Sequence, residues 1–338
     1  MGREIVMDAM ALYEEARAHE NALSGFYHRN VRVEDDSGPL LVRIPGPGAE
    51  PMDLTLWPEP EVLRAIRPFV SRAPRLVHAG VSPDFQIHEF IAGRRVDEIA
   101  QDGKPLPDVV LDGVEQFFGE VLRVPTAALA AVPPGWPDDG DTPGFARCLL
   151  DFARHLRDRA DASVDALYQA LGVPADPCGP LLERADRELA RRPFRLLHGD
   201  IHRKNMILSG RAGLVVLDWE LALWGDPLYD LADHLHKTAY TAADRQRTVA
   251  GWERAAPADC RAGAPAGLGF YLAYEEMKSA LVDTVRWGRR IVEAPAGRER
   301  QALAAELRTK LLAARPHWDA GPLPEAAEIE DTTLRLLG

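Results

Sequence analysis

Three side chains with oxygen donors, Asp200, Asn205 and Asp218, surround a β-hairpin pattern in the sequence. The hairpin consists of two apolar runs, Met206–Leu208 and Leu214–Leu217, separated by a polar turn that contains two glycines. Because hairpin strands are antiparallel, Asn205 before the first strand and Asp218 after the second are expected side by side. Asp200 lies in the loop that leads to the same end. The pattern therefore gathers two carboxylates and one amide in a small space.

This set of groups suits phosphoryl transfer. Carboxylate and amide oxygens are hard ligands of the kind that Mg²⁺ binds beside substrate phosphates. The reaction also needs a carboxylate that orients and deprotonates the acceptor hydroxyl. We expect Asp200 to be this base, and Asn205 and Asp218 to hold magnesium. The alternative is coincidental loop polarity, since Asp and Asn are common in turns.

The same segment resembles the aminoglycoside phosphotransferase and choline kinase superfamily. The matching residues are His198-Gly199-Asp200-Ile201-His202-Arg203-Lys204-Asn205, Asp218-Trp219-Glu220, Gly225-Asp226-Pro227 and Asp230-Leu231-Ala232. The resemblance implies that Asp200 is the catalytic base and that Asn205 and Asp218 are metal ligands. It also implies an α+β, two-lobed protein-kinase-like fold, with a small N-terminal β-sheet lobe carrying one helix and a larger, mainly helical C-terminal lobe.

The resemblance extends to residues that would bind the nucleotide. Arg43, in the strand pattern Leu40–Ile44, stands where the family carries its phosphate-binding cation. A guanidinium stays charged and grips phosphate with two donors, although a solvent-facing arginine is the alternative. Glu59 aligns with the helix glutamate that pairs with this cation, and Glu61 is its competitor.

Two further segments correspond to nucleotide contacts in the family. Ser24 and Gly25 lie where the phosphate-covering loop is expected, without a GxGxxG motif. Glu89 and Ile91 lie in the expected interlobe linker, whose backbone groups hold the adenine edge.

The element pattern supports a division near Gly93. Before it, the first 22 residues have a helical pattern, and strand patterns follow at 26–33, 40–44, 75–79 and 86–91, with a helix at 61–70. These elements predict a nucleotide-binding lobe over residues 1–92. After it, helices predict a catalytic and acceptor-binding lobe over residues 93–338. The predicted helices are 109–122, 144–159, 163–171, 180–190, 228–237, 268–293 and 298–314.

The chain differs from a protein kinase at two places. Gly199 precedes the catalytic aspartate, where a protein kinase carries an arginine, and Asp218 and Asp226 are only eight positions apart. The second difference leaves little room for an activation segment. The sequence therefore favours a small-molecule kinase.

Several charged and aromatic residues have competing interpretations. Lys204 is a candidate to stabilise the transferring phosphoryl group, and the alternative for Lys204 and Arg203 is a solvent-facing pair. Acidic residues of the long C-terminal helix either face the acceptor or form a solvated face, which we favour: they are Glu275, Glu276 and Asp283. Packing is the favoured role of Trp219, and helix capping that of Asp226.

Composition limits the remaining possibilities. The net charge of −12 disfavours nucleic-acid binding and is compatible with a cationic substrate. We expect no membrane span, because no apolar run has the necessary length. Three cysteines without a metal-binding spacing predict a reduced, cytoplasmic protein.

Together these patterns predict an ATP- or GTP-dependent O-phosphotransferase that uses Mg²⁺ and acts on a hydroxyl of a small molecule. An antibiotic or related natural product, with resistance as the role, is the favoured acceptor. A metabolite kinase of the choline, homoserine or sugar type is the alternative, and a non-catalytic nucleotide-binding pseudokinase belongs to a different class.

Overall fold

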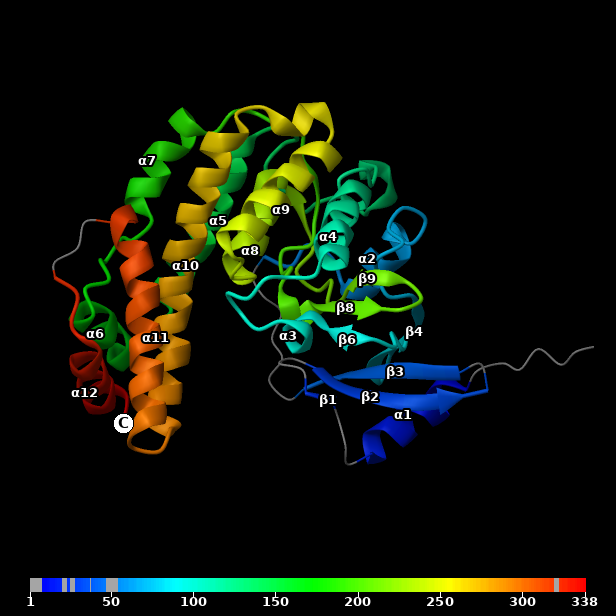
Figure 1. The fold of residues 1–338 in the computed structure, drawn as a ribbon, viewed down its shortest axis with the longest axis horizontal. Coiled ribbons are helices and arrows are strands. Elements are labelled where there is room, and N and C mark those ends of the chain that lie inside the picture. The colour runs from blue at the N-terminus through cyan, green and yellow to red at the C-terminus, as the bar shows by residue number, and fades with distance from the viewer. Residues whose placement is uncertain (1–7, 20–22, 25–27, 37, 47–53, 319–321) are drawn as a thin grey trace, which may run out of the picture. The chain divides into compact units, whose positions relative to one another are not determined.

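The computed structural model describes residues 8–19, 23–24, 28–36, 38–46, 54–318 and 322–338 (Figure 1). The chain divides into two compact units, each made of separate stretches of sequence. The first unit comprises 1–133, 195–224 and 237–257, and the second comprises 134–194, 225–236 and 258–338.

The first unit contains a five-stranded antiparallel sheet in the order β1-β2-β3-β5-β4. Its strands are β1 (Leu23–Ser24), β2 (His28–Asp35), β3 (Gly38–Pro45), β4 (Leu76–Val81) and β5 (Asp84–Glu89). Helix α1 (Ala9–Ala18) lies along this sheet (Figure 1), where its buried Leu12 and Ala16 share a core with Val31 and Val42. Central strand β3 thus has a fixed backbone position from which Arg43 projects.

Helix α2 (Glu59–Ile66) follows β3 in the chain and has a strongly amphipathic pattern. Val62, Leu63 and Ile66 are buried, and Pro60 stands in the first turn, where proline is tolerated. The helix begins two residues before the predicted start, so Glu59 belongs to its first turn.

The predicted hairpin is confirmed. Strand β8 (Met206–Ser209) pairs with β9 (Gly213–Val216), and β6 (Arg94–Arg95) adds a third strand on the other edge of β8. The backbone at Gly93 lies close to that of β8, because a Cβ on Gly93 would be 2.5 Å from the carbonyl oxygen of Leu208. Residues on both sides of position 93 therefore belong to the first unit, and the division into lobes at 92 stays a prediction.

The first unit also contains three α-helices and two short strands that follow β5 in the sequence. They are α3 (Val96–Ile99), α4 (Asp108–Val121), α9 (Ala242–Ala255), β7 (Arg195–Leu197) and β10 (Leu223–Gly225), the last two paired with each other.

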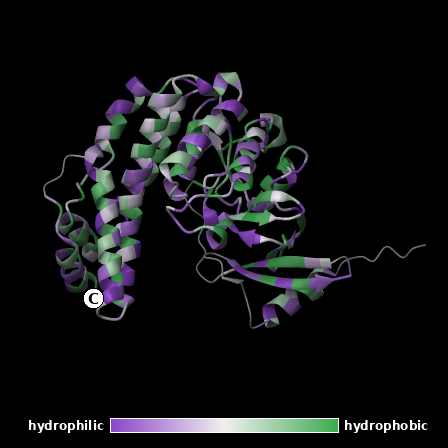
Figure 2. Cartoon of the chain, in the orientation of Figure 1, coloured by the Kyte–Doolittle hydropathy of each residue, from purple (hydrophilic) through white to green (hydrophobic). Residues whose placement is uncertain are grey.

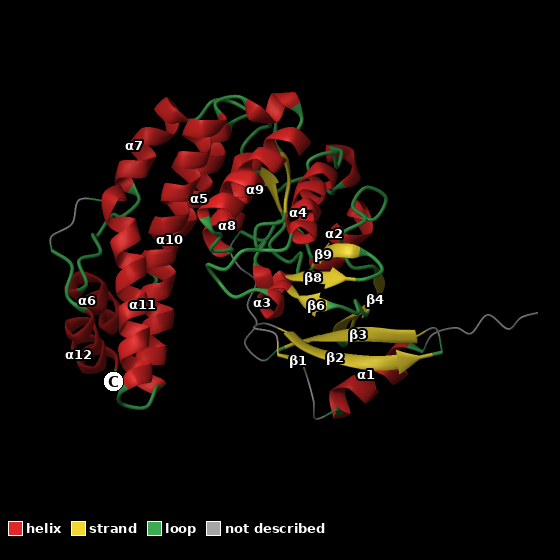
Figure 3. Ribbon diagram, in the orientation of Figure 1, coloured by secondary structure: helices red, strands yellow, loops and turns green. Residues whose placement is uncertain are grey.

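The second unit is helical in its described residues (Figure 3). Helices α10 and α11 pack against each other, and along both of them hydrophilic and hydrophobic residues alternate (Figure 2), as expected for helices with one buried face. The helices are α5 (Thr142–Asp158), α6 (Ala162–Ala170), α7 (Gly179–Glu188), α8 (Pro227–Lys237), α10 (Ala264–Glu293), α11 (Arg298–Ala314) and α12 (Ala326–Leu337). The predicted fold class, a small antiparallel sheet followed by a mainly helical remainder, is confirmed.

None of the helices within the described ranges combines the length and the apolar character that crossing a bilayer requires.

Candidate active site

Asp200 and Asn205 are joined by two hydrogen bonds. Asn205 Nδ2 donates to Asp200 Oδ2 and to the Asp200 carbonyl oxygen, both at 3.1 Å. This arrangement uses the nitrogen of the Asn205 amide and leaves its Oδ1 as an acceptor. The asparagine thus orients the carboxylate and presents an oxygen of its own.

Asp218 follows the hairpin at a strained backbone position. Its φ is +69°, in the left-handed region that costs a side-chain-bearing residue free energy. The residue before it, Leu217, donates its backbone N–H to the Asn205 carbonyl oxygen at 2.8 Å. The hairpin therefore brings the ends that carry Asn205 and Asp218 together, as predicted from the antiparallel pattern.

Arg43 connects the sheet to the hairpin. Its Nη1 donates to Glu59 Oε1 at 2.8 Å, and its Nη2 donates to Asp218 Oδ1 at 2.6 Å. Arg43 and Glu59 are buried, so the interpretation of Arg43 as a solvent-facing side chain is wrong. Glu59, and not the exposed Glu61, makes the ion pair.

Burial and charge act in opposite directions on these groups. Burial alone would lower the pKa of Arg43, but Glu59 and Asp218 outweigh it and raise that pKa. Burial would likewise raise the pKa of Asp200, but the Lys237 ammonium and His202 hold it well below its usual range. Asp200 is therefore ionised, as a base that accepts a proton must be.

Glu220 is a functional candidate that the sequence reasoning did not select. Burial and the neighbouring Asp218 raise the pKa of Glu220 to about 8, and its Oε2 lies 3.5 Å from His28 Nδ1. The Asp218 and Glu220 carboxylates act on each other electrostatically, and a divalent cation would neutralise their charge. The available signal was the position of Glu220 two residues after Asp218 and next to the buried Trp219.

These donors fit magnesium. Asn205 Oδ1, the second oxygen of Asp218 and the Glu220 carboxylate are hard oxygen ligands from one hairpin end. Among the described residues, no group of three or more His, Cys, Asp and Glu side chains is placed to hold a metal. The set at this hairpin end has two carboxylates, with the amide of Asn205 as its third donor.

The backbone before Asp200 requires glycine. Gly199 has a φ of +77°, and a Cβ at this position would lie 2.5 Å from the carbonyl oxygen of Leu221. His198, on its other side, is buried, and its ring contacts the Leu217 carbonyl oxygen at 3.0 Å. The arginine that precedes the catalytic aspartate of protein kinases has no space here.

The other predicted nucleotide contacts have the following positions. Ser24 lies in β1, where its backbone pairs with Arg29, whereas Gly25 lies outside the described residues. Glu89 ends β5, and its Oε1 accepts a hydrogen bond from the Arg75 backbone N–H at 3.2 Å. Ile91 lies two residues beyond this strand. Their roles with nucleotide stay predictions.

Arg203 and Lys204 differ in burial, and the alternative of a solvent-facing pair is wrong for Arg203. The Arg203 guanidinium is buried and donates to five backbone carbonyl oxygens, two of them in the segment after α8 and three in the loop after α3. Lys204 has an exposed side chain. Arg203 therefore fixes the loop that carries Asp200, and the catalytic role of Lys204 stays a prediction.

The acidic residues of α10 have side-chain partners within the second unit. Glu275 is buried and accepts a hydrogen bond from Lys278 at 2.7 Å, and the buried Asp283 accepts one from Ser279 at 2.7 Å. Glu276 lies 2.6 Å from His317. The favoured expectation of a solvated helix face is wrong for Glu275 and Asp283, which are packed and paired.

Asp226 and Trp219 have structural roles, as predicted. Asp226 Oδ1 accepts a hydrogen bond from the Leu228 backbone N–H at 3.1 Å at the start of α8, and the buried carboxylate also pairs with Arg192 and Tyr271. Trp219 is fully buried, and its indole donates to the Val216 carbonyl oxygen at 3.1 Å.

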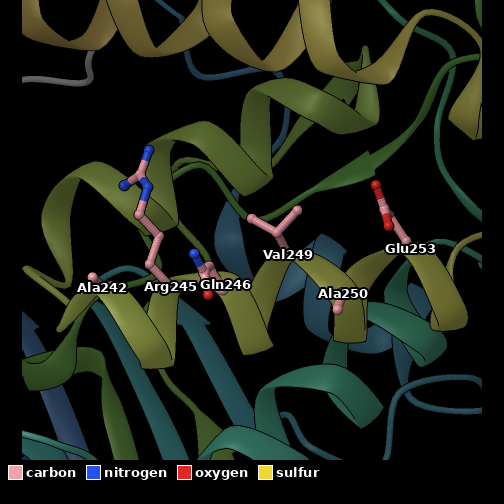
Figure 4. Close-up of a pocket in the computed structure, with 6 residues that line it drawn as sticks. All are labelled: Ala242, Arg245, Gln246, Val249, Ala250 and Glu253. Carbon is pink, nitrogen blue, oxygen red and sulfur yellow. The ribbon is translucent and has the colours of Figure 1, made fainter.

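A surface hollow on α9 is separate from these groups (Figure 4). All the residues that line it belong to that one helix: Ala242, Arg245, Gln246, Val249, Ala250 and Glu253. None of the predicted site residues is among them.

A second group that the sequence reasoning missed is Lys237, the last residue of α8, which belongs to the first unit as Asp200 does. Its Nζ lies 2.6 Å from Asp200 Oδ1. No local pattern signals this contact, because 37 positions separate the two residues.

Comparison with known proteins agrees with this geometry. A model of the phosphotransferase enzyme family matches residues 19–266. No curated protein sequence matches the chain.

Solved structures share the fold at low sequence identity. A choline/ethanolamine kinase family protein from Mesorhizobium loti has a TM-score of 0.58 and 14% identity, with 97% of this chain and 100% of that chain covered. The macrolide 2′-phosphotransferase MphH from Brachybacterium faecium has a TM-score of 0.56 and 17% identity, with 89% and 97% covered. A ternary complex of aminoglycoside phosphotransferase APH(4)-Ia with ADP and hygromycin B has a TM-score of 0.53 and 14% identity, with 91% and 97% covered.

Proposed function

Because the chain belongs to the phosphotransferase enzyme family, we propose that it transfers the γ-phosphoryl group of ATP or GTP to a hydroxyl of a small molecule. The observation that carries the proposal is the connected set of hydrogen bonds from Asp200 through Asn205 to the backbone before Asp218. It brings the carboxylate that we propose as the base close to the oxygens that we propose as metal ligands.

In this reaction the oxygen of the acceptor hydroxyl forms a bond to the γ-phosphorus, and the bond from that phosphorus to the bridging oxygen breaks. The nucleoside diphosphate leaves with the electron pair, and Asp200 takes the hydroxyl proton. Asn205, Asp218 and Glu220 would hold Mg²⁺, which would supply positive charge to the phosphates. Arg43 holds Asp218 in position and offers a guanidinium to the phosphates, and Lys204 stays a candidate for the transferring group.

The nucleotide would also contact the N-terminal part of the first unit. We assign its phosphates to Ser24, Gly25 and Arg43, and its base to the backbone around Glu89 and Ile91. The complex of the aminoglycoside phosphotransferase with ADP supports a nucleotide as donor. Since ATP is a cytoplasmic metabolite, we place the reaction in the cytoplasm.

The acceptor is proposed from the comparisons and from charge. Two of the similar structures are enzymes that modify antibiotics, and a net charge of −12 would attract a cationic acceptor. We therefore propose a hydroxylated antibiotic or related natural product. The similarity to a choline/ethanolamine kinase family protein supports a metabolite acceptor as the second candidate.

The test is a screen of hydroxylated antibiotics and of choline-, homoserine- and sugar-type metabolites with ATP or GTP. Mass spectrometry would detect the phosphorylated product, and release of ADP or GDP would be measured in parallel. We expect release that depends on one acceptor class and that disappears in Asp200→Ala. Asp186→Ala, which removes an exposed aspartate of α7, is the matched control.

A pseudokinase gives a different result. It would bind the nucleotide but form no product with any acceptor, and Asp200→Ala would leave its nucleotide affinity unchanged. That outcome would refute the proposed transfer.

A further inference from the structure

The Asp200 carboxylate is held by an ammonium group from a distant helix. Lys237 Nζ lies 2.6 Å from Asp200 Oδ1 and 3.4 Å from the Gly199 carbonyl oxygen. Both charged side chains are about three-quarters buried, with exposed fractions of 26% and 23%. A charge-assisted contact of this length between partly desolvated groups is stronger and better oriented than a surface ion pair.

The backbone that carries Lys237 is anchored to the same loop as Asp200. Arg203 donates to the Thr238 carbonyl oxygen at 2.7 Å and to the Ala239 carbonyl oxygen at 3.3 Å. Ala239 has a φ of +49°, and its carbonyl oxygen also accepts from the Gly103 backbone N–H at 2.8 Å. A strained non-glycine residue with this many contacts persists only where the surroundings fix it. Lys237 therefore approaches Asp200 from a rigid base.

The two oxygens of Asp200 have different partners. Oδ1 is bound by Lys237, whereas Oδ2 accepts from Asn205 at 3.1 Å and lies 3.4 Å from His202 Nε2. The stronger contact thus fixes one oxygen, and the other keeps weaker contacts that leave it able to accept a proton. Because its two oxygens have different partners, the Asp200 carboxylate is held in one orientation.

On the premise of the proposed phosphotransfer, we propose that Lys237 is a positioning residue, whose ammonium holds Asp200 Oδ1 so that Oδ2 faces the acceptor hydroxyl. The acceptor proton then moves to Oδ2 as the acceptor oxygen bonds to the γ-phosphorus and the nucleoside diphosphate departs. Lys237 forms no bond in this step. Its contribution is orientation, and a misplacement of about 1 Å costs as much as about 100-fold in rate.

The first test compares Lys237→Met, Lys237→Arg and the control Lys104→Met, which removes an exposed lysine of the same unit. For Lys237→Met we expect kcat to fall by about 10- to 100-fold while KM for the nucleotide changes by less than about threefold. Lys237→Arg should recover part of the loss, and Lys104→Met should match the wild type. A purely structural role would lower only the folded fraction, which also lowers apparent kcat at unchanged KM, so kcat is calculated per mole of folded enzyme from the amplitude of the thermal unfolding transition. A value per folded enzyme equal to that of the wild type would overturn the proposal.

Chemical rescue supplies a second readout. Lys237→Cys treated with 2-bromoethylamine regains an ammonium on a side chain of nearly the original length, and we expect kcat to return towards the wild-type value. The wild-type protein, whose half-buried Cys148 is also a thiol, is treated identically as the control. Failure of the treated variant to gain activity over the untreated one would count against the proposal.

The outcomes separate this inference from the proposed function. If the wild type transfers phosphate in an Asp200-dependent reaction and Lys237→Met keeps its kcat, the inference falls and the function stands. If the wild type transfers nothing, the function falls, and thermal unfolding then tests the contact alone. The decrease in Tm is measured for Lys237→Met, for Asp200→Asn and for the double variant. A decrease in the double variant that is smaller than the sum of the two single decreases supports the contact, and a decrease equal to that sum overturns it.

Discussion

Arg43 Nη2 lies 2.6 Å from Asp218 Oδ1, although 175 positions of sequence separate the two residues. The other nitrogen of the same guanidinium binds Glu59. One cation therefore joins the sheet, helix α2 and the end of the hairpin. A bidentate donor can satisfy two carboxylates at once, which a lysine ammonium does with less directional control.

Glu59→Gln is predicted to weaken both folding and nucleotide use. It removes one of the two carboxylates that compensate the buried guanidinium, and unpairing a buried ion costs about 3–5 kcal/mol. Since Asp218 remains, we expect a loss of about 2 kcal/mol in the free energy of unfolding and a higher KM for ATP. Urea denaturation and initial-rate kinetics measure these effects.

The matched control is Glu61→Gln, two residues along the same helix, where the side chain is exposed. It should leave both quantities unchanged. Equal effects of the two substitutions would show that the ion pair with Arg43 contributes neither to the free energy of unfolding nor to the KM for ATP.

Gly199→Ala is predicted to destabilise the protein and to abolish transfer. The new Cβ would stand 2.5 Å from the Leu221 carbonyl oxygen, and alanine is disfavoured at a φ of +77°. We expect a loss of at least about 2 kcal/mol. The control Gly210→Ala, in the hairpin turn with no atom within 4 Å of its Cβ, should be nearly neutral. A fully active Gly199→Ala enzyme would contradict the constraint.

Arg203→Met is predicted to be far more harmful to stability than Lys204→Met. The first removes the donor to the carbonyl oxygen of the buried Thr238, at about 1–3 kcal/mol, and to four carbonyl oxygens of less buried residues, so we expect a total of about 2 kcal/mol or more. The second changes an exposed side chain and should leave Tm unchanged. Differential scanning calorimetry of the two neighbouring variants decides this, and similar values of Tm would argue against the anchoring role of Arg203.

Acid is predicted to destabilise the protein through His88. Burial lowers the pKa of His88 to about 4 from its ordinary 6.5, with Arg43 and His28 acting in the same direction and Glu59 opposing them. The unfolded chain binds the proton first as pH falls. The contribution to stability is therefore complete above about pH 6.5 and is lost between about pH 6.5 and 4, by roughly 3 kcal/mol for a difference of this size.

His88→Gln should remove this part of the acid dependence while keeping a donor near Gln86. The free energy of unfolding is measured across pH 4–7 for both proteins. Parallel curves would mean that His88 is not the group responsible. His198, whose pKa burial also lowers to about 4, leaves a residual slope in the variant.

The helices with a clear apolar stripe were predictable from the sequence. The predicted helix 144–159 corresponds to α5, which is strongly amphipathic, and most others agree within a few residues. Helix α9 was missed because its buried residues are Thr248, Gly251 and Trp252, which form no periodic apolar pattern. Its one local signal was the cap at Thr241, whose hydroxyl accepts from the Asp244 backbone N–H.

The site was predictable where its geometry is local. A hairpin fixes the relation of Asn205 to Asp218, so spacing alone placed them. Lys237 comes from a helix far along the chain, and no spacing rule relates it to Asp200. Short strands such as β6 and β10 also escaped prediction, because two or three residues show no alternation.

The short connection from Asp218 to Asp226 has a consequence for control. The seven residues between them, Trp219 to Gly225, include no serine, threonine or tyrosine, and the last three form β10, paired with β7. A covalent switch of the kind that phosphorylation provides has no hydroxyl to use at this point of the chain. Phosphorylation that regulated the proposed transfer would therefore have to act on residues outside this connection.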